Sequence, residues 1–146
     1  MEFKRILVAI DGSKVDADVI QLACSLAKPN KGKVWVTYVI QLERSLPLDA
    51  EIKLEVDRAE AALDMAEKVA EDYDYEVSTD LLQARAMGPA LVSEAAERDA
   101  DLLLIGIGYQ TRFGEFSLGE IVPHVLKNAQ CRVMVMREPA SLRVDV

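Results

Sequence analysis

The chain has 146 residues and a formal net charge of −8, from 17 Lys and Arg against 25 Asp and Glu. One ordinary domain of this length buries a hydrophobic core without disulfides or metals, and an acidic balance argues against a nucleic-acid or anionic-membrane surface. The N-terminus shows no signal peptide and no apolar run approaches the ~20 residues that span a bilayer, so we expect a single cytoplasmic domain over residues 1–146.

Short β-branched runs alternate with longer helical patterns along the chain. The predicted elements, in order, are a strand at 4–10, a helix at 14–28, a strand at 33–40, a helix at about 49–72, a strand at 75–82, a helix at 88–98, a strand at 101–105, a helix at 119–128 and a strand at 132–136. Several strands are nearly continuous in apolar residues, which is typical of strands covered on both faces. Residues 138–146 are predicted to be a loose C-terminal tail.

This alternation predicts an α/β fold, in which right-handed crossovers produce a single doubly wound, open, parallel five-stranded sheet with helices on both faces. Ligands of such sheets lie beyond the carboxyl ends of the strands. The loops that follow residues 10, 40 and 105 are therefore the expected positions of a functional site.

Asp11 follows the first predicted strand, within the sequence VAIDGS. A carboxylate at this position can accept hydrogen bonds from a ribose or from an adenine amino group. The alternative is that Asp11 or Ser13 caps the first helix, because both residue types are frequent at N-caps. The local sequence alone favours capping.

Residues 101–120, DLLLIGIGYQTRFGEFSLGE, lead from a buried strand through a glycine-containing loop to Gly119 at the start of the last helix. Glycine permits close backbone approach to an anion, and a helix start offers unpaired N–H groups and a partial positive charge. Glu115 and Glu120 nevertheless place two carboxylates in the same region. The segment thus combines the outline of a phosphate site with an electrostatic argument against its use.

VAIDGS, the long second helix, DLLLIG and LGEIVPHVLKNAQCRVMVMR together resemble the universal stress protein family over essentially the whole chain. The resemblance implies the strand order 3-2-1-4-5. In family members that bind ATP, the loop after the fourth strand reads Gly, two residues, Gly, nine residues, Gly and then Ser or Thr. By analogy, a nucleotide site would use Asp11, Val39 at the end of the second strand, Gly106 and Gly119.

Two positions depart from this pattern. Tyr109 stands where the second glycine is expected, which obstructs backbone approach to a phosphate unless Gly108 takes over with the loop shifted by one residue. Glu120 replaces a hydroxyl by a carboxylate that only accepts hydrogen bonds when ionised. Two like charges ~4 Å apart repel by ~4 kcal/mol at an effective dielectric of 20, about a thousandfold in affinity. An acid in the first turn is also favoured by the helix dipole alone.

We therefore expect no tight ATP binding and no cofactor. The alternative is a site for ATP or AMP with Mg²⁺, since a divalent cation would offset part of the repulsion.

Catalytic machinery is not evident. His124 is the single histidine, without a Cys or acid at ligand spacing, so neither a metal site nor a Ser-His-Asp or Cys-His arrangement is predicted. Cys24 and Cys131 lie far apart in the sequence and form no CxxC pair, which predicts two reduced, buried thiols. The chain is accordingly expected not to be an enzyme.

The last strand, RVMVM, would be an edge strand in the family's order, and an open apolar edge favours pairing with another chain. In relatives this strand pairs with its copy across a twofold axis. The resemblance thus implies a C2 homodimer that buries Val133, Met134, Val135 and Met136. The expected function is that of a dimeric regulatory or interaction protein with unidentified protein partners. The alternatives are an adenine-nucleotide sensor and, last, an enzyme acting on a nucleotide or phosphate ester.

Overall fold

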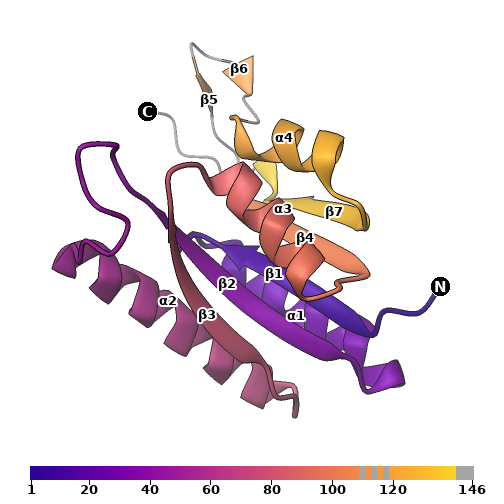
Figure 1. Ribbon diagram of the computed structural model, residues 1–146. Coiled ribbons are helices and arrows are strands. Elements are labelled where there is room, and N and C mark those ends of the chain that lie inside the picture. The colour runs from indigo at the N-terminus through magenta and orange to yellow at the C-terminus, as the bar shows by residue number, and fades with distance from the viewer. Residues whose placement is uncertain (109–110, 113–114, 117–118, 141–146) are drawn as a thin grey trace.

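The computed structural model describes residues 1–108, 111–112, 115–116 and 119–140, and its core is one parallel sheet (Figure 1). The strands are β1 (Arg5–Ile10), β2 (Lys33–Gln41), β3 (Ser78–Ala84), β4 (Leu102–Ile107), β5 (Thr111–Arg112), β6 (Glu115–Phe116) and β7 (Arg132–Arg137). The helices are α1 (Asp16–Ala27), the 3₁₀ turn η1 (Lys28–Asn30), α2 (Lys53–Asp72), α3 (Met87–Glu97) and α4 (Ile121–Asn128). The separate pair β5 and β6 is antiparallel.

The five long strands lie in the order β3-β2-β1-β4-β7, and every neighbouring pair is parallel. This confirms the predicted fold class and the strand order 3-2-1-4-5. Because β1 is central, the chain leaves it in one direction to form β2 and β3 and in the other to form β4 and β7. The strand order therefore reverses at β1, and its carboxyl end is where an open α/β sheet holds ligands.

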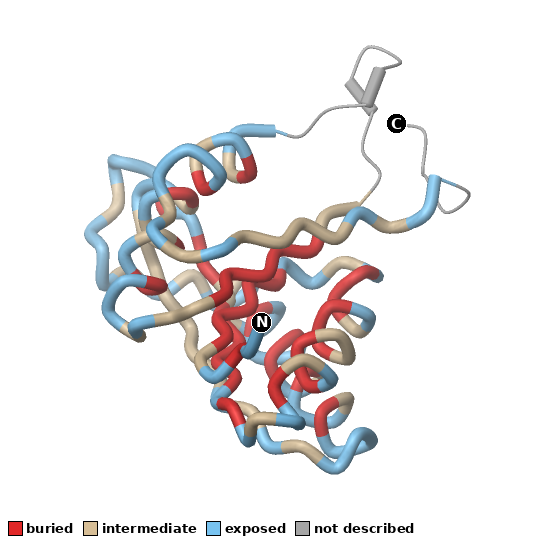
Figure 2. Tube along the Cα trace, turned by 90° about the vertical axis from the view of Figure 1, so that its right-hand side faces the viewer, coloured by how far each residue is buried: buried red, intermediate tan, exposed pale blue. Residues whose placement is uncertain are grey.

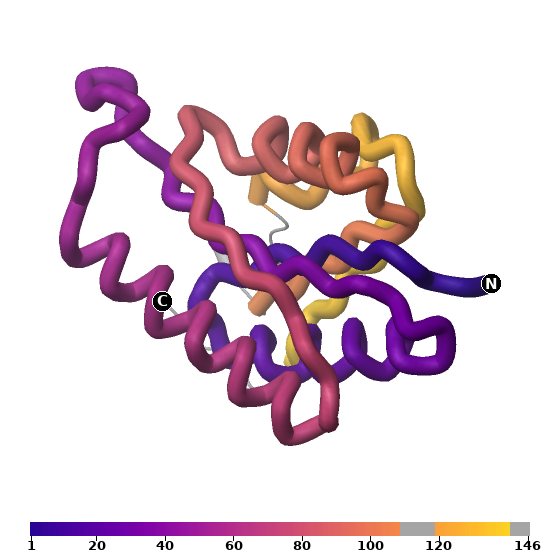
Figure 3. The backbone as a smooth tube through the Cα atoms, turned by 60° about the horizontal axis from the view of Figure 1, so that its bottom comes forward, coloured from indigo at the N-terminus to yellow at the C-terminus, as the bar shows by residue number. Residues whose placement is uncertain are grey.

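Two hydrophobic layers enclose the sheet. Alternate side chains of the central strands, such as Val8 and Leu104, pack against α1 and α2 on one face. Their neighbours, such as Leu7 and Leu103, pack against α3 and α4 on the other. Figure 3 shows α3 and α4 on the side opposite α1 and α2, and Figure 2 shows buried residues in the central strands and in the helices that cover them. The near-continuous apolar strands are explained by this burial on both faces.

Several element bounds differ from the predicted ones. The third strand begins at Ser78 rather than 75 and continues to Ala84. Tyr75, predicted within this strand, instead donates its hydroxyl to the carbonyl of Gly32. The short pair β5 and β6 inside the loop after β4 was not predicted, because two-residue strands have no detectable periodicity.

The described part of the C-terminal segment is attached to the sheet. Glu138 donates its N–H to the carbonyl of Ile107 at 2.9 Å, which extends the pairing of β7 with β4 by one residue. Residues 141–146 of the predicted tail lie outside the described residues. Both cysteines are free as predicted, although Cys24 is buried and Cys131 only half-buried. Among the described residues, no helix combines the length and the apolarity needed to cross a membrane.

Candidate functional site

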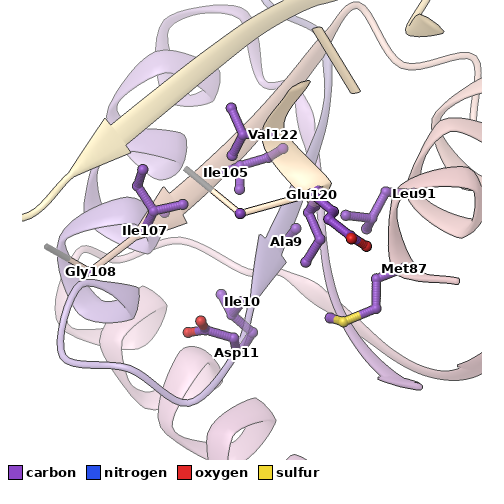
Figure 4. A pocket seen from close by; sticks show the side chains of 13 residues that line it. Ala9, Ile10, Asp11, Met87, Leu91, Ile105, Ile107, Gly108, Glu120 and Val122 are labelled. Atoms are coloured by element: carbon purple, nitrogen blue, oxygen red, sulfur yellow. The ribbon is translucent and has the colours of Figure 1, made fainter. Parts of the chain in front are cut away.

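A cavity of about 150 Å³ opens where the carboxyl ends of β1 and β4 meet the start of α4 (Figure 4). Its walls are mainly apolar and include Ala9, Met87, Leu91 and Ile105. Of the residues predicted for a nucleotide site, it brings together Asp11, Gly106, Gly108, Gly119 and Glu120. This position, at the point where strand order reverses, is the one that the fold class predicts for a ligand.

Two predicted positions are not placed at the cavity. Val39 is buried in the layer that faces α3 and α4, and it is not among the residues that line the cavity. Tyr109, predicted to obstruct phosphate approach, lies outside the described residues.

Asp11 does not cap α1, and neither does Ser13. The N-cap is Val15, which makes no side-chain capping bond. One carboxylate oxygen of Asp11 instead accepts the N–H of Ser13 at 3.0 Å, a local bond that forms a turn and delays the helix to Asp16. The favoured capping interpretation is therefore wrong. Asp11 remains exposed at the cavity, where it can accept hydrogen bonds from a ligand.

Asp16 is a buried carboxylate directly beneath the Asp11 loop. It is fully buried and accepts the N–H of Gly12 at 2.8 Å and that of Asp11 at 3.4 Å. Burial, followed by the nearby charge of Asp11, raises the pKa of Asp16 to about 6. Gly12 permits the turn because its φ is +84°, a conformation that residues with a Cβ rarely adopt.

Sequence reasoning missed Asp16. The only signal in the sequence was its position: Asp16 is an acid in the first turn of the helix and lies five residues after Asp11, which follows the first strand.

Gly106 lines the cavity, but packing already explains its lack of a side chain. A Cβ built at this position would lie 2.5 Å from Cγ2 of Val19 and 3.0 Å from Cγ1 of Val15. The glycine thus allows α1 to approach β4 closely, whether or not a ligand is bound.

Substitution of Gly106 by alanine should therefore destabilise the protein by about 1–3 kcal/mol, because the helix must move away or the valines must leave their rotamers. The matched change Gly108→Ala should cost about 0.5 kcal/mol or less, since the added Cβ would meet only the carboxylate end of the flexible Glu138 side chain, with Oε1 at 3.1 Å and Cδ at 3.6 Å. Urea denaturation of both variants measures the difference. Equal stability of the two variants would contradict the packing role.

The far side of the cavity is formed by the start of α4. Gly119 has φ +69° and a Cβ there would meet nothing within 4 Å, so the glycine serves the backbone conformation rather than packing. Glu120 was predicted in the first turn of the last helix, but it occupies the N-cap position just before α4. It makes no side-chain capping bond there. Its carboxylate lines the cavity, and Figure 4 shows it on the side opposite Asp11.

The electrostatics of the cavity follow from these residues. Asp11 and Glu120 supply two carboxylates, and no Lys or Arg stands among the described residues that line the cavity. A phosphate placed at the start of α4 would meet the exposed carboxylate of Glu120, which repels it. This arrangement can accept hydrogen bonds from hydroxyl or amino groups and disfavours anions.

Within the described part of the chain, no three His, Cys, Asp or Glu side chains are grouped as metal ligands would be. His124 packs against α3, where a Cβ on Gly88 would lie 2.9 Å from its ring. Its Nδ1 is 3.4 Å from Nδ2 of Asn128.

These features define a doubly wound α/β domain with a cavity at the carboxyl edge of its sheet. The family model named Usp, universal stress protein family, matches residues 2–137, and the chain belongs to this family. Universal stress protein MJ0531 of Methanocaldococcus jannaschii is 28% identical over 143 residues, which cover 94% of this chain and 84% of the relative.

Solved structures with the same fold include a universal stress protein from Archaeoglobus fulgidus. Its TM-score is 0.75 at 22% identity, with 90% of this chain and 97% of that chain covered. A universal stress protein from the same organism, solved in complex with dAMP, has a TM-score of 0.71 at 22% identity, with coverage of 92% and 98%.

Proposed function

We propose that this protein is a dimeric regulatory or interaction protein that does not bind ATP tightly. The observation that carries the proposal is the pair of carboxylates, Asp11 and Glu120, in a cavity whose described lining contains no cation. A triphosphate at the start of α4 would place several negative charges near Glu120, and each such contact costs several kcal/mol.

The proposal assigns no catalytic activity to the chain. Hydrolytic and transfer mechanisms need an activated nucleophile, a positioned acid or base, or a metal. His124 is the single histidine of the sequence, and its ring lies against α3 rather than at the Asp11 cavity. The residues at the cavity therefore favour binding of a small molecule or regulation of a protein-interaction surface over catalysis.

A second candidate function is a sensor for an adenine nucleotide. It is favoured by the position of the cavity, by Asp11, and by the structure of the Archaeoglobus fulgidus relative in complex with dAMP. This function requires that phosphates avoid Glu120 or that a divalent cation lies between them. The same cavity would then hold the nucleoside portion of the ligand.

Dimer formation is supported by the exposed edge of β7. Its four central residues, Val133 to Met136, are only partly buried, and among the described residues one side of the strand has no neighbour in the sheet. An open apolar edge strand pairs readily with a second copy across a twofold axis.

Val135→Lys should convert the dimer to a monomer at micromolar concentration, because it places a charge in the paired edge. The control is Leu126→Lys, which adds the same charge to an exposed position on α4 and should leave the dimer intact. Light scattering gives the mass of each variant. A monomeric mass for the unmodified protein would contradict the dimer.

Native mass spectrometry of the protein as purified tests the proposal as a whole. The expected spectrum shows twice the mass of the chain with no small molecule retained. A nucleotide retained in the spectrum would favour the sensor function instead.

A further inference from the structure

A second depression lies on the other side of Asp11, between the start of α1 and the facing side of α2. This α1–α2 groove has a volume of about 560 Å³ and includes Asp11, Gly12, Lys14, Tyr38 and Arg58 among its lining residues. Asp11 therefore separates two cavities: the apolar one beside Glu120 and a groove that carries two cations.

Small residues keep the groove open. Arg58, Ala61, Ala62 and Met65 lie at helical spacing on one side of α2, so two small side chains separate Arg58 from Met65 along the groove. At Gly12 an added Cβ would meet only Cε2 of Tyr38, at 4.0 Å. The hollow is thus shaped by the side chains that these positions lack.

The cations of the groove have no counter-charge in contact. Lys14 and Arg58 are exposed, and within the described residues neither forms an ion pair. Arg58 acts electrostatically on the Tyr38 hydroxyl, as do Asp11, Asp16 and Glu55. Burial and these carboxylates raise the pKa of Tyr38, so at neutral pH its hydroxyl is a hydrogen-bond donor.

The two cations and the one carboxylate of the groove together favour a particular class of ligand. A bare anion would be attracted by Lys14 and Arg58 but repelled by Asp11 at the end of the groove. A ligand that presents a hydroxyl to Asp11 and its negative group further along satisfies all three charges. Arginine is suited to phosphate because its planar donors bind two oxygens at once.

We propose that the α1–α2 groove binds a phosphorylated polyol, with the phosphate on Arg58 and Lys14 and a ligand hydroxyl donating to Asp11. Tyr38 donates its hydroxyl to the same ligand. The groove lies on the side of Asp11 away from the start of α4, so a phosphate bound there avoids the carboxylate of Glu120. This second site goes beyond the proposed function, because it would bind a phosphate group that the cavity beside Glu120 repels.

Ribose 5-phosphate is the probe, with ribose and inorganic phosphate as partial ligands. Titration of the ¹⁵N-labelled full chain, followed at the amide of Gly12, should show saturable binding of ribose 5-phosphate. Each partial ligand should bind at least about tenfold more weakly, because it lacks one of the two contacts. Raising the salt concentration should weaken the binding of ribose 5-phosphate and leave ribose unaffected.

Variants locate the site. Arg58→Ala and Lys14→Ala should each weaken ribose 5-phosphate binding by about tenfold, while Arg58→Lys retains part of it. Lys68→Ala, another exposed cation of α2 that lies outside the groove, is the matched control. Absence of saturable binding overturns the inference, as does an affinity that survives the double change of Arg58 and Lys14. Failure of the proposed function appears separately, as tight ATP binding that Arg58→Ala leaves unchanged.

Discussion

Measurable ATP binding is expected when Glu120 is replaced by serine and Tyr109 by glycine in the same chain. By the family resemblance, Gly106, Gly119 and their spacing match the ATP loop, and Asp11 has the position of the acid that follows the first strand. Removal of the carboxylate should contribute most, up to about a thousandfold in affinity, because one like-charge contact at ~4 Å costs ~4 kcal/mol at an effective dielectric of 20. Displacement of a fluorescent ATP analogue measures the gain.

The appropriate control is Glu97→Ser, which removes an exposed carboxylate at the far end of α3 and should leave ATP binding unchanged. The gain from Glu120→Ser should shrink as salt is added, since exposed charges are screened over about 8 Å in physiological buffer. If the folded double variant binds no ATP, the charge of Glu120 is not what excludes it.

The second large effect is expected from Asp16→Asn and depends on pH. The pKa of Asp16 rises from 3.8 to about 6 on folding, so between these values the native state binds more protons than the unfolded state. Stability should therefore fall as pH rises through this window. Ionisation of Asp16 in the folded protein therefore lowers the free energy of unfolding above pH 6 by about 3 kcal/mol relative to its value below pH 4.

Asparagine at position 16 carries no charge and should remove this contribution. The difference in unfolding free energy between the unmodified protein and the variant should change by up to about 3 kcal/mol from about pH 4 to about pH 7, in favour of the variant at the higher pH. Asp18→Asn, an exposed carboxylate in the same helical turn, is the control and should keep the original pH dependence. Parallel curves for the unmodified protein and Asp16→Asn would refute the assignment.

The fold was predictable because the evidence for it is repeated along the chain. Five apolar runs and four helical patterns in alternation predict a parallel α/β sheet, and β1 and β4 occupy nearly the predicted residues. The strand order came from the family resemblance, since alternation alone does not state which strands are neighbours. The start of β3 was misplaced because Tyr75 and Val77 are apolar and pack on the core, although they precede the first strand residue, Ser78.

The site was only partly predictable. Asp11 and Glu120 were identified because Asp11 follows a strand and Glu120 lies at a helix start, whereas Gly106 was identified from the family's ATP-loop pattern. The prediction that Asp11 or Ser13 caps the first helix was wrong, because the Asp11 carboxylate bonds within its own turn and the helix begins only at Asp16. Asp16 escaped notice because its importance lies in burial, which depends on how α1 packs on the sheet rather than on neighbouring residues.

Equilibrium titration of the unmodified protein with a fluorescent ATP analogue, with and without Mg²⁺, tests most directly whether the protein excludes ATP. We expect no saturable binding at micromolar analogue in either condition, because the carboxylate of Glu120 at the start of α4 would repel the phosphates that the proposed ATP site places there. Saturable micromolar binding without Mg²⁺ would contradict this expectation, since the carboxylate would then not exclude the phosphates. Micromolar binding that needs Mg²⁺ would also contradict it and would favour the nucleotide sensor.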